Sequence, residues 1–160
     1  MSSTRIRVER HVFADPTSTA LLLAGPAALE LWPGVRRIGE VGGRVLVEAV
    51  LAGSPDGVSD DAPATAGGPI TAASVTARPP RRTPTAFMTH FAWTGPDLPV
   101  TQGLLTLTYA HGDGLPSTHA ELVLESEGLA ESRIDQAGLT AMAVGFLTNL
   151  ASAAESRRAA

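Results

Sequence analysis

The stretch from Ser132 to Arg158 has the pattern of one long amphipathic helix, and it follows a succession of short segments that alternate like β-strands. About 25 residues at roughly 1.5 Å each span roughly 37 Å, which is long enough to cross a whole sheet. Ser132 and Asp135 approximate an N-terminal capping box. A helix with one apolar stripe needs a concave partner, and the preceding strands can supply it. The stripe comprises Leu139, Met142, Phe146, Leu150 and Ala153.

Period-two alternation predicts about seven strands before this helix. In the first strand, Ile6 and Val12 share one face, which Arg10 interrupts. Gly42-Gly43 predicts a two-residue hairpin turn, because glycine tolerates positive φ at both turn positions. The strands are expected at residues 5–13, 37–41, 44–51, 69–78, 85–94, 100–111 and 117–125.

Two short helices are expected between the first two strands. Asp15 followed by Pro16 is typical of an N-cap and a first-turn proline, and this pair opens a helix over residues 17–24. Pro26 opens the second helix, which ends at Trp32-Pro33-Gly34 because the residue before a proline disfavours helix.

Length and composition indicate a single domain over residues 1–160. The chain has 160 residues, of which 44% are hydrophobic and 18% charged, and can therefore bury a core. Residues 53–68 are rich in small and polar residues without periodicity, so we expect a long, mobile loop there. The tail at residues 156–160 is expected to fray.

Charge balance and residue usage exclude several classes of function. The net charge of −4 argues against nucleic-acid and anionic-membrane partners, which draw on clustered positive charge. The chain has no cysteine and no lysine, which excludes disulfides, thiolate nucleophiles and lysine Schiff bases. We find no export signal and no run of about 18 apolar residues, so we expect a cytoplasmic protein without stable membrane insertion. The Ala, Gly, Pro and Arg bias is typical of a high-GC bacterial genome.

The histidines do not predict a metal site, and no cofactor is predicted. They are scattered over four predicted strands without H-x-H or H-x-x-x-H spacing: His11, His90, His111 and His119. His119 and Glu121 lie two apart on one strand and could form a general-base pair. We favour a solvated outer face for them, because Ala120 and Leu122 look like the inward set.

The strongest binding signal is aromatic. Phe87, Phe91 and Trp93 share one strand face, and the C-terminal helix would bring its apolar stripe opposite them. Two interpretations stay open, a cavity wall and an ordinary core. Arg10 is the one inward-facing charge, and an ion pair or a strand bulge is favoured over contact with a ligand. The candidate ligand-binding residues are Arg10, Phe87, Thr89, Phe91, Trp93, Tyr109, Met142, Phe146 and Leu150.

Three stretches carry a resemblance to a known superfamily. "IRVERHVFADP" looks like a first strand running into a first helix, "ELWPGVRRIGEVG" like a second helix entering the second strand, and "VGFLTNLASAAE" like a closing helix. Their order over the whole chain resembles the START-like, or SRPBCC, superfamily. The resemblance implies an α+β helix-grip fold, in which a curved antiparallel sheet of about seven strands grips the long C-terminal helix around an apolar cavity. Members include lipid and hormone carriers, polyketide aromatases and cyclases, ring-hydroxylating oxygenase subunits and chaperone activators.

The leading functional hypothesis is binding of a small hydrophobic ligand, such as a lipid, a polyketide or another polycyclic or acyl molecule, between the sheet and the C-terminal helix. One alternative is a polyketide cyclase or aromatase, in which Tyr109, Thr89 and Arg10 orient the carbonyls of the substrate. A second alternative is an interaction module without a cavity, such as a chaperone activator. Whether the protein is an enzyme, and whether it forms a homodimer, stay open.

Overall fold

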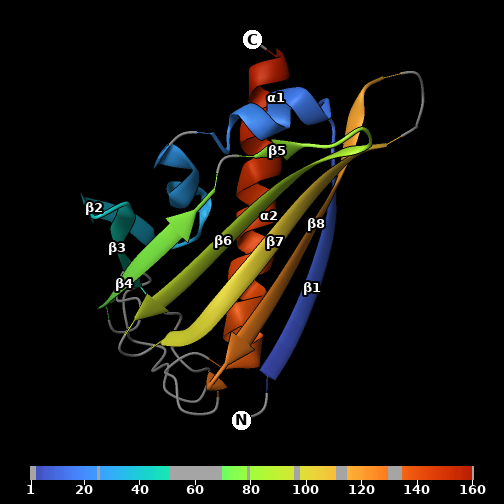
Figure 1. Cartoon of the computed structure of the whole chain (residues 1–160). Helices are drawn as coiled ribbons and strands as arrows, with labels where there is room; N and C mark the ends of the chain where they lie inside the picture. Colours follow the sequence, from blue (N-terminus) through green and yellow to red (C-terminus); the bar gives the residue numbers. More distant parts are fainter. Residues whose placement is uncertain are drawn as a thin grey trace, which may run out of the picture.

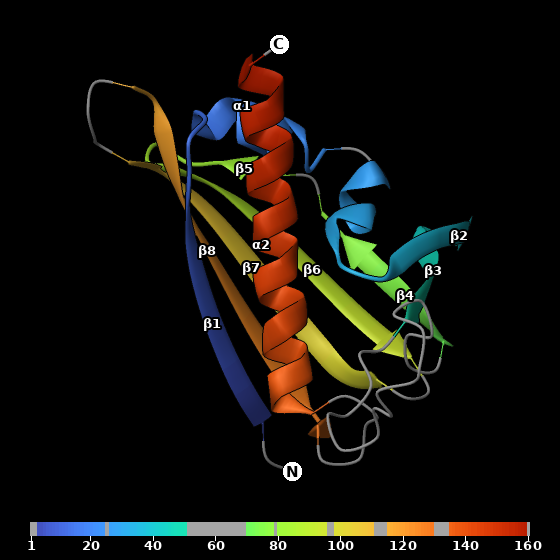
Figure 2. The ribbon, with the colours of Figure 1, turned by 180° about the vertical axis from the view of Figure 1, so that it is seen from behind.

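One antiparallel sheet curves around a long C-terminal helix (Figures 1 and 2). One short helical segment lies at the C-terminal end of this helix, against the sheet, and the other lies between the helix and the far edge strand of the sheet. The α+β class, the curved sheet and the long closing helix were predicted from the sequence, and the structure confirms all three. The computed structural model describes residues 3–24, 26–50, 70–78, 80–95, 98–110, 115–129 and 135–159.

The sheet has its first and last strands side by side. β1 pairs with β8, and the order continues through β7, β6, β4 and β3 to β2, while the two-residue β5 pairs with β6. The two-residue β5 was not among the predicted strands, and the other strands fall close to their expected positions. Their bounds are Ser3–Val12 for β1, Val35–Val41 for β2, Arg44–Val50 for β3, Ile70–Ala77 for β4, Arg81–Arg82 for β5, Ala86–Gly95 for β6, Leu98–Ala110 for β7 and Ser117–Glu127 for β8.

The β2–β3 hairpin forms around the predicted glycine pair. Gly42 and Gly43 have φ angles of 59° and 79°, the left-handed values that a two-residue hairpin turn of this kind requires. The loop predicted at residues 53–68 lies outside the described residues, so its mobility and the single-domain assignment stay predictions.

Three helical segments accompany the sheet: α1 (Pro16–Leu21), the 3₁₀ segment η1 (Pro26–Leu31) and α2 (Gln136–Ala159). Both short helices lie where the sequence predicts them. α2 begins one turn later than predicted because Asp135 is itself the cap. Its Oδ1 accepts a hydrogen bond from the amide of Gly138 at 2.7 Å, and its carbonyl accepts one from Leu139 at 2.9 Å. Ser132, the other half of the predicted capping box, lies outside the described residues.

Buried side chains of α2 meet the inner face of the sheet. Of the predicted stripe, Leu139, Phe146 and Leu150 are buried, whereas Met142 and Ala153 are only half-buried. The helix is long and apolar enough to pass for a membrane span, as core helices commonly are, but here it packs against β1 and β8. The other buried members of the helix, which the predicted stripe omits, are Ala143, Leu147, Ala151 and Ala154.

Asp15 caps α1 as predicted, and the cap makes stability depend on pH. Its carboxylate accepts a hydrogen bond from the Ser18 amide at 3.1 Å, and hydrogen bonding to Ser18 holds the pKa of Asp15 below its usual value. The cap therefore stabilises the fold above the unfolded-state pKa of about 3.9, and this contribution is lost as pH falls through the lower folded-state pKa.

We expect Asp15→Ala to lower the free energy of unfolding by about 0.5–2 kcal/mol at neutral pH. The difference from the unmodified protein should shrink as the pH drops below about 4, where the carboxylate becomes protonated. Urea unfolding at neutral and acidic pH measures both effects. Asp15→Asn is the control, because it keeps a neutral hydrogen-bond acceptor at the cap. It should lose less stability than Asp15→Ala, and its free energy of unfolding should depend less on pH than that of the unmodified protein. A deficit for Asp15→Ala that is the same at both pH values would contradict this account.

Candidate ligand pocket

A pocket lies between the inner face of the sheet, η1 and α2. It encloses about 70 Å³ of free space, and its lining is almost entirely apolar. Each wall comes from a different part of the chain, so the pocket exists only in the folded sheet-and-helix arrangement. Representative lining residues are Trp32 after η1, Val47 on β3, Val75 on β4, Leu105 on β7, and Leu139 and Phe146 on α2.

Four aromatic rings form one side of this pocket, and Trp32 is the ring that joins them. Trp32 stacks on Phe146 with ring centroids 4.4 Å apart, and it meets Trp93 edge-on at 5.1 Å. Phe91 lies 5.5 Å from Trp32 and stacks on Trp93 at 5.7 Å. Offset-stacked and edge-to-face pairs at these separations add favourable energy beyond the burial of area. The cluster thus links β6 to α2 through the segment after η1.

Two contacts hold the Trp32 segment against α2. The side-chain amide of Asn149 donates a hydrogen bond to the carbonyl of Leu31 at 2.7 Å. Pro33 packs so closely on Gly145 that a side chain at residue 145 would collide with the proline ring. The absence of a Cβ at Gly145 therefore allows the approach that puts Trp32 over the pocket.

The structure places five of the nine predicted residues in the pocket lining: Thr89, Phe91, Trp93, Met142 and Phe146. Phe87 points to the same side of β6 but lies further along the strand, where it packs on the core with the Arg82 guanidinium 6.0 Å from its ring centroid. Leu150 is fully buried in the core and does not line the pocket.

The structure corrects the placement of the other two predicted residues. Tyr109 is 52% exposed, because the β7–β8 hairpin extends away from α2 at that end of the sheet (Figures 1 and 2). Arg10 is also exposed, since it lies on the edge strand β1, and β1 pairs with β8 in regular register from Ser3 to Val12. Access to solvent at the edge removes the burial cost of this charge, so the predicted bulge is not needed.

Trp32 is the aromatic residue of the pocket lining that sequence reasoning missed. From the sequence, Trp32 is predicted only as part of a helix stop before Pro33 and Gly34. The available signal was its type, because it is one of only two tryptophans in the chain and large aromatic residues dominate cores and binding sites.

The pocket lining offers few polar groups and no titratable ones among the described residues. Among the described residues that line the pocket, none is titratable, and Thr89 is the one that carries a hydroxyl group. The indole N–H groups of Trp32 and Trp93 are the other polar atoms that the lining side chains bring. These groups can orient a ligand by hydrogen bonding, but none of them is a general acid or base near neutral pH.

Comparison with solved structures shows that this architecture recurs at low sequence identity. The Zhui aromatase/cyclase of Streptomyces sp. R1128 superposes with a TM-score of 0.62 at 15% identity, covering 98% of this chain and 96% of that one. A protein of Thermus thermophilus superposes with a TM-score of 0.60 at 16% identity, covering 96% of this chain and 99% of that one. Major latex-like protein 151 of Panax ginseng superposes with a TM-score of 0.58 at 10% identity, covering 95% of this chain and 97% of that one. No family model and no curated protein sequence matches the chain.

The chain has the helix-grip fold. This confirms the fold that the resemblance to the START-like superfamily implied. At identities of 10–16% the superpositions establish the fold alone. The pocket is therefore the space that this fold leaves between the curved sheet and the C-terminal helix.

Proposed function

We propose that the protein binds a small hydrophobic molecule in the pocket between the sheet, η1 and α2. The observation that carries the proposal is an enclosed lining that is apolar apart from Thr89 and the two indole N–H groups, with four aromatic rings on one side. Binding sites for small molecules are commonly concave and apolar with a few placed polar groups. The affinity would come from apolar area removed from water, at about 25 cal/mol per Å².

The size of the cavity constrains the ligand and the way it enters. The free space of about 70 Å³ is small beside the roughly 300–1,000 Å³ of typical ligand pockets. A polycyclic or long acyl ligand therefore enters only if lining side chains move. Met142 is half-buried and has an unbranched, flexible side chain, which makes it the natural element to shift. Rotation of Phe91, which is also half-buried, would widen the same side.

Binding is better supported than the polyketide-cyclase alternative. Similarity to the Zhui aromatase/cyclase favours that alternative at the level of fold. The cyclase hypothesis relied on Arg10, Thr89 and Tyr109 to orient carbonyls, and only Thr89 lines the pocket. The second alternative, an interaction module without a cavity, is disfavoured by the pocket itself. The cytoplasmic location stays a prediction. Whether the protein is a monomer or a homodimer stays open.

Intrinsic fluorescence gives a direct test, because both tryptophans of the chain line the pocket. Protein purified from its own host would first be analysed by native mass spectrometry and solvent extraction for a bound apolar molecule. Candidate ligands would then be titrated while tryptophan emission is followed. Saturable emission changes at one-to-one stoichiometry support the proposal. A clean mass with no extracted molecule, and no saturable change for fatty acids, flavonoids or polyketide aromatics, would contradict it.

Thr89→Val tests the single hydroxyl in the lining. Valine keeps the shape of threonine but removes the donor and acceptor, so a ligand with a carbonyl or hydroxyl group should bind up to about tenfold more weakly, as one lost hydrogen bond predicts. The same emission titration measures the change. Thr106→Val, on the adjacent strand β7 but outside the pocket lining, is the matched control and should bind like the unmodified protein. Equal affinities for Thr89→Val and the unmodified protein would remove this hydroxyl from recognition.

A further inference from the structure

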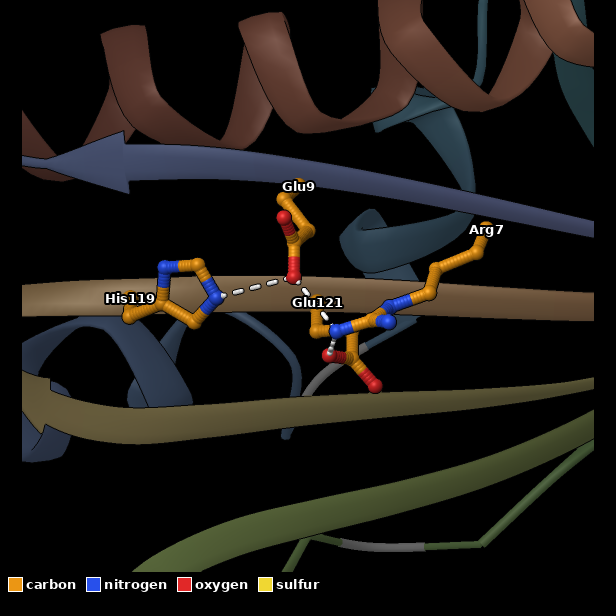
Figure 3. A network of polar contacts seen from close by, with 4 residues as sticks. All are labelled: Arg7, Glu9, His119 and Glu121. Carbon is orange, nitrogen blue, oxygen red and sulfur yellow. Dashed lines mark hydrogen bonds and ion pairs between the residues drawn. The ribbon is translucent and has the colours of Figure 1, made fainter.

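A cluster of four polar side chains lies on the outer face of the sheet, on the side away from α2 (Figure 3). Arg7 and Glu9 come from β1, and His119 and Glu121 come from β8. Along both strands the alternate positions are the buried core residues, such as Ile6 and Leu122, which fixes the cluster on the opposite face. Nothing in the pocket on the inner face uses these groups.

The pairing register of β1 and β8 brings the residues of this cluster together. Glu9 stands directly opposite Glu121, and two residues further along the same face His11 stands directly opposite His119. Directly opposite residues have Cβ atoms about 4.5–5.5 Å apart. Two strands that are about a hundred residues apart in the chain therefore present two carboxylates and two imidazoles as one compact patch.

The contacts inside the patch converge on one point. Nη2 of Arg7 donates to Oε1 of Glu9 and to Oε2 of Glu121, both at 2.7 Å. Nε2 of His119 lies 3.4 Å from the same Oε1 of Glu9. One ligand atom from each of Glu9, His119 and Glu121 lies within 4.8 Å of the other two. A cationic nitrogen thus already occupies the position between the two carboxylate oxygens.

We propose that Glu9, His119 and Glu121 form a binding site for a divalent transition-metal ion of the zinc class, and that Arg7 is the resident cation that such an ion displaces. Tetrahedral zinc with bonds of about 2.0–2.2 Å holds its ligand atoms about 3.3–3.5 Å apart, which the His119 and Glu9 atoms already match. The Glu121 oxygen lies within 4.8 Å of both of these atoms and would have to approach them to complete the set. A mixed imidazole and carboxylate set suits Zn²⁺, Ni²⁺ and Cu²⁺ better than the all-oxygen sites of Ca²⁺ or Mg²⁺.

The surroundings permit the exchange of Arg7 for a metal ion. The Arg7 side chain is 59% exposed, so its guanidinium can swing into solvent without a desolvation cost. Arg7, whose positive charge holds the pKa of Glu9 below its usual value, is the group that must leave the Glu9 and Glu121 oxygens before a metal ion can bind them. His11, whose ring packs edge-on against Phe13, is a second imidazole beside the site.

Titration of the full chain with zinc chloride by isothermal calorimetry tests the proposal. Arg7→Met removes the competing cation and is expected to raise the zinc affinity at least about tenfold. Glu9→Gln and His119→Gln each keep the side-chain size and are expected to lower it at least about tenfold. His90→Gln is the matched control, because His90 is an exposed histidine on β6 that belongs to no such cluster among the described residues.

Substitution by Co²⁺ gives a spectroscopic readout that a merely structural ion-pair network would not produce. Visible absorption bands of tetrahedral cobalt should appear with Arg7→Met and vanish when His119→Gln is added. Far-UV circular dichroism checks that the variants, all at surface positions, stay folded. The proposal is overturned if neither the unmodified protein nor Arg7→Met binds zinc with a dissociation constant below about 1 mM. It is equally overturned if His119→Gln binds as well as the unmodified protein.

Discussion

Replacing Trp32 by alanine is expected to lower the free energy of unfolding by about 3–5 kcal/mol, the range for a buried large aromatic side chain. Trp32 is 6% exposed and contacts the rings of Phe91, Trp93 and Phe146. Its loss removes apolar burial, three ring contacts and the bridge from β6 to α2. Because a domain of this size has about 5–15 kcal/mol of stability, the variant should fold but melt well below the unmodified protein. Urea unfolding followed by far-UV circular dichroism measures the difference.

A chemical rescue separates the cavity from general damage at this position. Trp32→Ala leaves an apolar void of indole shape, and dry voids of this kind bind small aromatic molecules. Added indole should therefore restore part of the lost stability in a saturable way. Val144→Ala, at an exposed site on α2, is the control and should change stability by less than about 0.5 kcal/mol. A Trp32→Ala loss below about 1 kcal/mol, or no effect of indole, would show that the four-ring cluster does not hold the sheet to the helix.

The fold was predictable from the sequence because periodicity reports burial directly. Thr89 and Trp93 fell on the inward face of β6 by simple alternation, and Leu139 and Phe146 on the buried side of α2 by helical spacing. Asp15 with Pro16 and the Gly42-Gly43 pair marked a helix start and a hairpin by local chemistry alone. Each of these signals is contained in a few neighbouring residues.

What the sequence did not predict depends on contacts between distant segments. Alternation put Tyr109 on the inward face of β7, but no local pattern shows that the β7–β8 hairpin extends away from α2 there. Trp32 joins the pocket only because Gly145 and Asn149, more than a hundred residues later, bring its segment onto α2. His119 acquires Glu9 as a neighbour through the β1–β8 register, so a search for histidine spacing along the chain could not find that cluster.

Replacing Gly103 by alanine is expected to weaken ligand binding at least about tenfold while leaving the protein folded. Gly103 stands opposite Phe91 in the β6–β7 register, on the inner face, and the Phe91 ring lies across its Cα. A Cβ added at Gly103 would overlap the ring carbons Cζ, Cε1 and Cε2 of Phe91, so the ring must rotate. Leu105 and Trp93 on the same face are buried, and the pocket that Phe91 lines is free volume into which the ring can turn. The expected loss of affinity is at least about tenfold, with a stability cost of about 1–3 kcal/mol for overpacking.

A second substitution makes the test specific to the ring. Phe91→Leu shortens the side chain that blocks the pocket, so the double variant Gly103→Ala with Phe91→Leu should recover most of the binding that Gly103→Ala loses. Gly39→Ala is the matched control, because Gly39 is also a strand glycine and a Cβ there meets no atom within 4 Å. Emission of the two pocket tryptophans follows binding in every variant, and urea unfolding follows stability. If Gly103→Ala binds ligand as tightly as the unmodified protein, the ligand does not occupy this pocket. If the double variant stays as weak as Gly103→Ala, the loss comes from the β7 backbone and not from the displaced Phe91 ring.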